Sequence, residues 1–247
     1  MRIEDIQGRE ITTLDDWAKL YDTPRERKHW KKHRSAYSIA DFILNQNGAE
    51  VIRSRISATL GHEIRFDRIV PEYETRFDGY GKGRMHDLGI FGQVDSGERV
   101  FVGLEAKVDE TFNASVRDAY LTAKANQIAG KSTKAPERIE KLLELHFGHF
   151  KPPKVSMFGV RYQLLYATAG TLAVGTDISI LFVAVFKTSL YNELAAAENY
   201  RDYIHFMTEV GATPIDASDK AATGHELVLD GKKLTCLYEY FDLYSIY

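Results

Sequence analysis

The 247-residue sequence contains one cysteine, Cys236. A single cysteine excludes an internal disulfide and a zinc cluster of cysteine ligands, and such scarcity fits a reducing cytosol. No apolar run reaches the ~20 residues that cross a membrane, and the longest, around Ile178 to Phe186, has the length of a strand. The first residues, Met-Arg-Ile-Glu-Asp, lack the apolar stretch of a secretory signal. We therefore expect a cytoplasmic protein with no membrane partner.

Three sequence motifs of common enzymes are also missing. The sequence has no Gly-x-x-x-x-Gly-Lys-Ser/Thr loop, no Gly-x-Gly-x-x-Gly fingerprint and no Gly-x-Ser-x-Gly elbow. These absences argue against P-loop, dinucleotide-binding and serine-hydrolase chemistry. With 32 Lys and Arg against 35 Asp and Glu, the net charge is −3, which argues against a protein coated in positive charge. A local basic patch remains compatible with this balance.

The densest basic stretch runs from Arg25 to Arg34 and has Trp30 near its middle. A run of like charges is often a solvated helix face. The same residues could instead form an arm that contacts the phosphates of a nucleic acid, with the indole ring packing or stacking. On the second interpretation the candidate nucleic-acid-binding residues are Arg25, Lys28, Lys31, Lys32 and Arg34.

Hydrophobic periodicity predicts helices and strands along the whole chain. We expect a single α/β domain with a core at about 35–188, a basic helical extension at 1–34, and a C-terminal helix and hairpin within 189–247. The expected helices cover about 35–44, 51–60, 113–129 (with Asn113 as N-cap), 136–148, 160–174 and 190–210. The expected strands cover 63–77 and 178–186, with hairpins at 86–108 and 226–235.

The hairpin at 86–108 carries the pattern that is most informative about chemistry. A three-residue loop centred on Ser96 sets the register so that Leu88 faces Leu104 and Asp87 faces Glu105. Strand alternation then places the two leucines on a core face and the two carboxylates on the opposite face. Gly89 and Gly103 lie beside the carboxylates, and we expect them to leave open space for a ligand or metal.

Two carboxylates opposed across a strand pair repel each other. The pair becomes favourable if a divalent cation lies between them or if Lys107, on the same face, neutralises part of the charge. Oxygen ligands without cysteine or histidine suit Mg²⁺ or Mn²⁺, which bridge to phosphate oxygens. The pattern predicts metal-assisted phosphodiester hydrolysis. Charges on a surface strand, kept for solubility and edge protection, are the plainer alternative.

In these residues the sequence resembles the PD-(D/E)XK nuclease superfamily. The resemblance rests on Asp87 followed by Glu105-Ala106-Lys107 on adjacent strands, and it covers roughly 35–188. It implies the restriction-endonuclease-like fold, with an αβββαβ core whose mixed central sheet is flanked by helices. The segment 108–112 and the segment 161–166 are also similar to stretches in bacterial members. His86 stands where the family has proline, and by alternation we expect its ring to point away from Asp87.

The resemblance also implies roles for individual residues. Asp87 and Glu105, joined by the backbone carbonyl of Ala106, would ligate Mg²⁺ or Mn²⁺, and Lys107 would orient or deprotonate water or stabilise the transition state. Gln163, one turn before Tyr166, resembles a Gln-x-x-Tyr element placed against the site in several members. Some members add an acid from an earlier element, for which we prefer Glu72 to Glu50.

Two classes of function follow from these expectations. The first is a Mg²⁺-dependent nuclease that hydrolyses phosphodiester bonds of DNA, and it could act as a homodimer because duplex cleavage needs two sites. The second is a catalytically silent nuclease-like module that binds DNA or protein, which the net charge of −3 favours slightly. Other phosphoryl chemistry, such as nucleotide hydrolysis, is a weaker third interpretation.

Overall fold

The computed structural model describes residues 1–23, 26–148, 155–215 and 222–243. Its centre is a mixed sheet of eight strands in the order β1-β2-β3-β4-β5-β8-β7-β6. The strands are β1 (Arg2–Ile3), β2 (Ile64–Thr75), β3 (Arg84–Val94), β4 (Arg99–Lys107), β5 (Ile178–Lys187), β6 (Thr213–Ile215), β7 (Ala222–Leu229) and β8 (Lys232–Asp242). The helices are α1 (Leu14–Ala18), α2 (Ser35–Asn45), α3 (Gly48–Leu60), α4 (Val116–Ile128), α5 (Ala135–Phe147), α6 (Tyr162–Ala173) and α7 (Glu193–Glu209).

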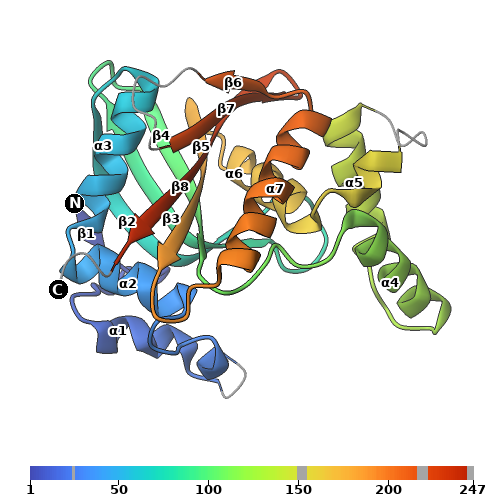
Figure 1. Cartoon of the computed structure of the whole chain (residues 1–247), viewed down its shortest axis with the longest axis horizontal. Coiled ribbons are helices and arrows are strands. Elements are labelled where there is room, and N and C mark those ends of the chain that lie inside the picture. The colour runs from blue at the N-terminus through green and yellow to red at the C-terminus, as the bar shows by residue number, and fades with distance from the viewer. Residues whose placement is uncertain (24–25, 149–154, 216–221, 244–247) are drawn as a thin grey trace.

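Helices cover both faces of this sheet (Figure 1). On one face, apolar residues of α2 and α3 such as Phe42 and Ile52 form one core cluster with Leu88 and Leu104 of the sheet. On the other face, α5, α6 and α7 form a second cluster against β5, β7 and β8. Helix α4 extends away from the sheet at the right of Figure 1. The expected mixed sheet flanked by helices is therefore confirmed.

Most expected elements are present with small differences at their ends, but the hairpin expected at 226–235 is longer, with strands Ala222–Leu229 and Lys232–Asp242. The expected N-cap of α4 is wrong, because Asn113 has φ +61° and the helix begins after Ser115. The Ser115 hydroxyl accepts a hydrogen bond from the backbone N–H of Asp118 at 3.1 Å, as an N-cap should. Among the described residues, no helix is long and apolar enough to span a membrane.

The register of the β3–β4 hairpin is confirmed from Leu88 to Gln93, but the expected pair of Asp87 with Glu105 is not part of the ladder, which ends at Leu88 and Leu104. Leu88 pairs with Leu104 and Ile90 pairs with Val102, as a loop centred on Ser96 requires. The same four side chains belong to the core beneath α2 and α3. The opposite side of β4 therefore faces α6, and this side carries the charged residues.

The C-terminal hairpin extends the central sheet. Strand β8 pairs in parallel with β5, and β7 and β6 follow it to the edge. Strand β5 is apolar along its length and buried on both faces, so it requires neighbours on both sides. Strand β4 is one of these neighbours and β8 is the other. The sheet thus continues beyond residue 188.

Candidate active site

A cleft with a volume of about 380 Å³ opens where β4 ends, next to the first turn of α6. The six residues that the sequence assigned to catalysis or to a metal all line it: Glu72, Asp87, Glu105, Ala106, Lys107 and Gln163. They come from β2, β3, β4 and α6, which are separated by up to about a hundred residues in the chain. The fold thus brings the complete predicted set to one place.

Hydrogen bonds connect these side chains. The Asp87 Oδ2 atom accepts from the backbone N–H of Ala106 at 2.7 Å, which ties β3 to the end of β4. The Gln163 amide bridges the other two: its Nε2 donates to Glu105 Oε2 at 2.9 Å, and its Oε1 accepts from Lys107 Nζ at 3.4 Å. Gln163 therefore fixes the positions of the carboxylate and the ammonium relative to each other.

Glu105 is almost fully enclosed, with 1% of its surface exposed. Its Oε1 atom forms an ion pair with Arg84, a residue at the start of β3 that the sequence analysis missed. The Arg84 side chain is itself 12% exposed, and its Nε atom is buried without a hydrogen-bond partner. Arg84 lies three residues before Asp87, so strict alternation assigns the two to opposite faces, and no sequence signal marked it.

Alternation assigned His86 to the face opposite Asp87 and Glu105, but in the structure its ring lies beside Glu105. Its ring is fully buried, and Nδ1 lies 3.5 Å from Glu105 Oε1. The β3–β4 ladder ends at the Leu88–Leu104 pair. In β2 the residue between the partners of Leu88 and His86 is Glu72, whose φ is +50°, so regular alternation does not extend to His86. Burial, with the charge of Arg84 nearby, lowers the pKa of His86 well below its usual range. His86 therefore lies beside Glu105 as a neutral ring.

The expectation that two glycines leave open space is also wrong. A Cβ atom at Gly89 would lie 2.7 Å from the Tyr73 ring. At Gly103 it would lie 2.6 Å from the Thr171 hydroxyl and 2.8 Å from the His86 ring. The glycines are required because bulky side chains from β2, β3 and α6 pack directly on the strands. The hollow that lies beside the carboxylates is at the strand ends.

Glu72 lies in β2 with an unusual backbone. Its φ angle is +50°, a left-handed conformation that is uncommon for a residue with a side chain. The Tyr21 hydroxyl donates a hydrogen bond to Glu72 Oε1. Tyr21 belongs to the N-terminal segment, and burial together with the Glu72 charge raises the pKa of its phenol. The N-terminal segment therefore contacts the wall of the cleft.

Burial dominates the electrostatics of the cleft. It lowers the pKa of Lys107, while the charges of Asp87 and Glu110 act in the opposite direction. It raises the pKa of Asp87, against the opposing effects of Lys107 and the Ala106 N–H. The Lys107 ammonium lies 5.2 Å from the centre of the Phe112 ring. Perturbed acids and bases of this kind are typical of functional sites, although structural ion pairs produce them too.

Glu110 is a second cleft residue that the sequence analysis did not select. It lines the cleft, and its segment, 108–112, was noted only as similar to stretches in nucleases. The pKa of Glu110 is lowered, with the Lys107 charge and a hydrogen bond from Ser35 outweighing its burial. The acid is therefore charged and faces the same ammonium as Asp87.

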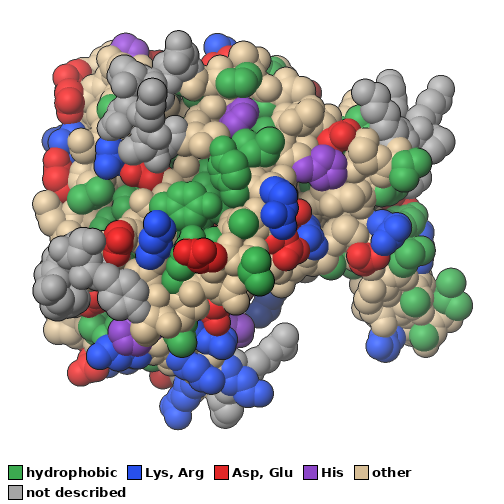
Figure 2. Space-filling view, in the orientation of Figure 1, with side chains coloured by type: hydrophobic (Ala, Val, Ile, Leu, Met, Phe, Trp, Pro, Cys, Tyr) green, Lys and Arg blue, Asp and Glu red, His purple; other side chains and the backbone are tan. Residues whose placement is uncertain are grey.

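The basic segment contributes only in part. Arg34 lines the cleft and lies 3.5 Å from Asp109, whereas Lys32 lines a separate cavity. Lys28 and Lys31 are exposed and line neither hollow, and Arg25 lies outside the described residues. Figure 2 shows Lys and Arg side chains gathered at the lower edge of the molecule, over the segment between α1 and α2.

The donor set agrees in chemistry with a hard divalent cation. Carboxylates of Asp87, Glu105 and Glu72 and the carbonyl of Ala106 are the oxygen ligands that Mg²⁺ and Mn²⁺ prefer. In the present arrangement Arg84 occupies one oxygen of Glu105. Within the described ranges, no group of three or more His, Cys, Asp or Glu side chains is arranged as a metal site. Because Gln163 bonds the other oxygen of Glu105, a cation at this carboxylate would compete with both contacts, above all with the charged guanidinium.

Comparison with known proteins gives one match. No curated protein and no solved structure matches the chain. One family model, described as a domain of unknown function (DUF6946), matches residues 10–238. That range includes all of the helices among the described residues, and every strand except β1 and the last residues of β8. The chain therefore belongs to the DUF6946 family.

Proposed function

We propose that this protein is a Mg²⁺- or Mn²⁺-dependent nuclease that hydrolyses phosphodiester bonds of DNA. The observation that carries the proposal is the convergence of Asp87, Glu105, Lys107 and Gln163 in one cleft, where Gln163 hydrogen-bonds Glu105 and Lys107 and Asp87 accepts from the Ala106 N–H. The order α2, α3, β2, β3, β4, α6, β5 contains the elements expected of a restriction-endonuclease-like core. We include this fold assignment in the proposal.

Each of these residues has a proposed role in the hydrolysis. Asp87, Glu105 and the Ala106 carbonyl would hold the cation, which when bound stabilises charge on the scissile phosphate and makes water more acidic. Lys107 is buried and has a lowered pKa, so it can exchange a proton with the attacking water or donate to a phosphate oxygen. Gln163 positions Lys107 against Glu105.

DNA is the proposed substrate because the cleft adjoins positive charge. Arg34 lines it, and the exposed Lys28, Lys31 and Lys32 belong to the same segment. Cations next to a metal site neutralise the phosphates that flank the reacting one. Cleavage of both strands of a duplex requires two such sites, so we include a homodimer on DNA in the proposal.

One observation favours the second candidate function, a silent module that binds DNA or protein. The ion pair between Arg84 and Glu105 already balances the carboxylate that would otherwise need a metal. If Arg84 holds Glu105 permanently, the cleft binds phosphates without cleaving them. The two functions therefore differ in whether a cation can replace Arg84.

Incubation of the purified protein with supercoiled plasmid distinguishes the nuclease from the silent binding module. We expect nicked and linear products with Mg²⁺ or Mn²⁺, none with EDTA, and none from Asp87→Asn, which keeps the size of the side chain but loses its charge. If the plasmid stays intact in Mg²⁺ and in Mn²⁺ while a gel-shift assay still shows DNA binding, the result supports the silent module and contradicts the nuclease. Equal cleavage by wild type and Asp87→Asn would point to a contaminating nuclease and contradict the assignment.

A further inference from the structure

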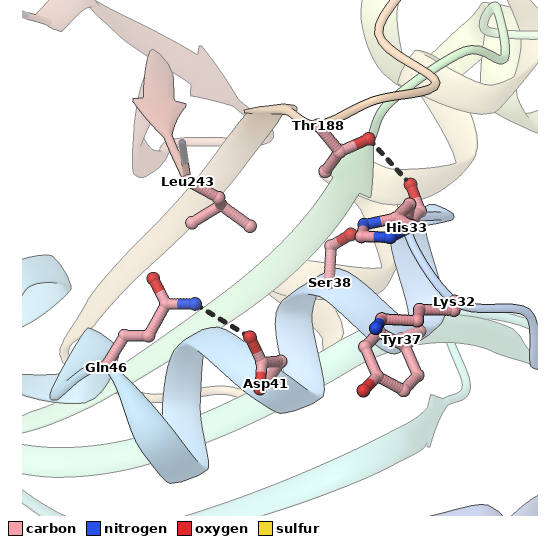
Figure 3. A pocket seen from close by; sticks show the side chains of 8 residues that line it. All are labelled: Lys32, His33, Tyr37, Ser38, Asp41, Gln46, Thr188 and Leu243. Carbon is pink, nitrogen blue, oxygen red and sulfur yellow. Dashed lines mark hydrogen bonds between the residues drawn. The ribbon is translucent and has the colours of Figure 1, made fainter. Parts of the chain in front are cut away.

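A second cavity, of about 350 Å³, lies between α2 and the ends of β5 and β8 (Figure 3). Its lining is mixed: a cation, an acid, an aromatic ring, amide and hydroxyl groups, and one leucine. The residues are Lys32, His33, Tyr37, Ser38, Asp41, Gln46, Thr188 and Leu243. Such a mixture of apolar surface and a few polar groups is usual in a small-molecule site.

Two polar atoms in this lining are buried without a partner. They are Ser38 Oγ, on a residue that is 2% exposed, and Gln46 Oε1. The Gln46 Nε2 atom donates to Asp41 Oδ2 at 2.7 Å, which fixes the orientation of the amide because a carboxylate needs a donor. In Figure 3 the free amide oxygen is turned toward Leu243. Buried polar atoms usually have partners, so this pair points to a missing hydrogen-bonding ligand.

One turn of the chain separates this cavity from the cleft. His33 has φ +69°, and its carbonyl accepts a hydrogen bond from the Thr188 hydroxyl at 2.8 Å, so the turn is fastened to the end of β5. Lys32 and His33 line the cavity, whereas Arg34 and Ser35 line the cleft. A nucleic-acid strand with one phosphate in the cleft would cross this turn to place a neighbouring nucleotide in the cavity.

We propose that this cavity binds one nucleotide of the substrate strand, at a position beside the reacting phosphate. The choice of ligand rests on the proposed function. Lys32 would bind its phosphate and the Tyr37 ring would pack on its base or sugar. Ser38 and Gln46 would hydrogen-bond the polar edge of the base, with the Gln46 oxygen accepting from a ring N–H or an amino group.

Tryptophan fluorescence can report binding directly. The Trp30 and Tyr37 rings are 5.5 Å apart, so a ligand against Tyr37 should change Trp30 emission. Trp30 also stacks on Tyr21 beside the cleft, so the cavity variants Ser38→Ala and Gln46→Leu assign the signal to the cavity. We would titrate Asp87→Asn protein in EDTA with each deoxynucleoside 5′-monophosphate and with a short single strand, so that neither metal nor cleavage contributes. We expect saturable changes, tighter for the oligonucleotide, and loss of the signal in Trp30→Phe.

Substitutions separate a ligand group from a structural one. Ser38→Ala removes an unpartnered hydroxyl, so it should weaken binding roughly tenfold without lowering the melting temperature. The matched control is Ser57→Ala, because the Ser57 hydroxyl is buried but accepts from the Ile64 N–H at 3.1 Å. It should lower the melting temperature and leave binding unchanged. Gln46→Leu and Lys32→Ala should also weaken binding, while Lys131→Ala should not.

Two results would overturn the proposal. One is the absence of saturable binding by any nucleotide or by the oligonucleotide, and the other is equal binding by the Asp87→Asn protein with and without Gln46→Leu. Saturation by free nucleotides alone, with no added affinity for the strand, would also contradict a subsite of the substrate strand. None of these results depends on plasmid cleavage, so failure of this proposal is distinguishable from failure of the proposed function.

Discussion

Two buried histidines show how differently this fold treats polar groups in two regions. At the contact between α5 and α6, both ring nitrogens of His146 have partners 2.7 Å away, the Leu142 carbonyl and the Thr168 hydroxyl. At the candidate site, neither ring nitrogen of His86 has a hydrogen-bond partner, and Nε of neighbouring Arg84 has none either.

The hydrogen bonds of His146 stabilise the fold, whereas the unpartnered nitrogens of His86 and Arg84 do not. Buried polar groups without partners cost folding free energy, about 1–3 kcal/mol each. A fold tolerates this cost at sites where the groups serve a ligand or a reaction. The comparison predicts that substitutions near Glu105 change metal binding and activity, whereas substitutions near His146 change stability alone.

The largest expected effect is on catalysis. Lys107→Met keeps the apolar stem of the side chain and removes the ammonium that Gln163 holds. We expect plasmid cleavage to fall by about 10²–10⁴-fold, the size typical of losing a proton-transfer group. Lys233→Ala, on the exposed β7–β8 hairpin, is the control and should cleave normally. Cleavage by Lys107→Met within a factor of a few of wild type would remove the role assigned to Lys107.

The next effect is on stability, and it should depend on metal. Arg84→Gln leaves Glu105 buried without its cation, which we expect to cost about 3 kcal/mol in EDTA. Saturating Mn²⁺ should restore most of this loss, because the ion takes the place of the guanidinium. The control, Arg138→Gln, breaks the buried ion pair with Asp78, and Mn²⁺ should not repair it. Urea unfolding of wild type and the two variants, with and without Mn²⁺, gives these changes in the free energy of unfolding.

The pH dependence of the free energy of unfolding tests whether His146 is buried as a neutral ring. Burial lowers the pKa of His146 to about 4, below the 6.5 of an exposed histidine. Between these values the unfolded chain is protonated and the folded protein is not, so stability is retained above pH 6.5 and lost as pH falls toward 4. The loss amounts to about 3 kcal/mol. Urea unfolding at pH 7 and pH 4.5 should show this loss in wild type and a shallower slope in His146→Gln.

The smallest effect comes from the same substitution at both histidines. His146→Leu removes two hydrogen bonds and should destabilise the protein by about 2 kcal/mol. His86→Leu removes two unpartnered nitrogens, so its stability should stay within about 1 kcal/mol of wild type. Melting curves of the two variants measure both losses of stability. A larger loss for His86→Leu than for His146→Leu would contradict the assignment of His146 to stability and His86 to the site.

The sequence predicts well what depends on local periodicity. The β3–β4 register follows from one turn and strict alternation, and both hold between Leu88 and Gln93. The prediction fails beyond the Leu88–Leu104 pair, where the neighbouring strand contains the left-handed Glu72, so the positions of His86 and Arg84 could not be obtained from alternation. Pairing of β8 with β5 joins segments that are far apart in the chain, and no local signal specifies it. The resemblance, rather than periodicity, supplied Glu72 and Gln163.

Titration of the protein with Mn²⁺, with the free ion measured by electron paramagnetic resonance, tests directly whether the cleft holds a cation. If Asp87 and Glu105 hold the cation, wild type should bind one ion per chain, and Asp87→Asn should bind it roughly tenfold more weakly or not at all. Arg84→Gln should bind the ion more tightly than wild type, because its Glu105 has no competing guanidinium. Equal Mn²⁺ binding by wild type and Asp87→Asn, or none by either, would contradict the account.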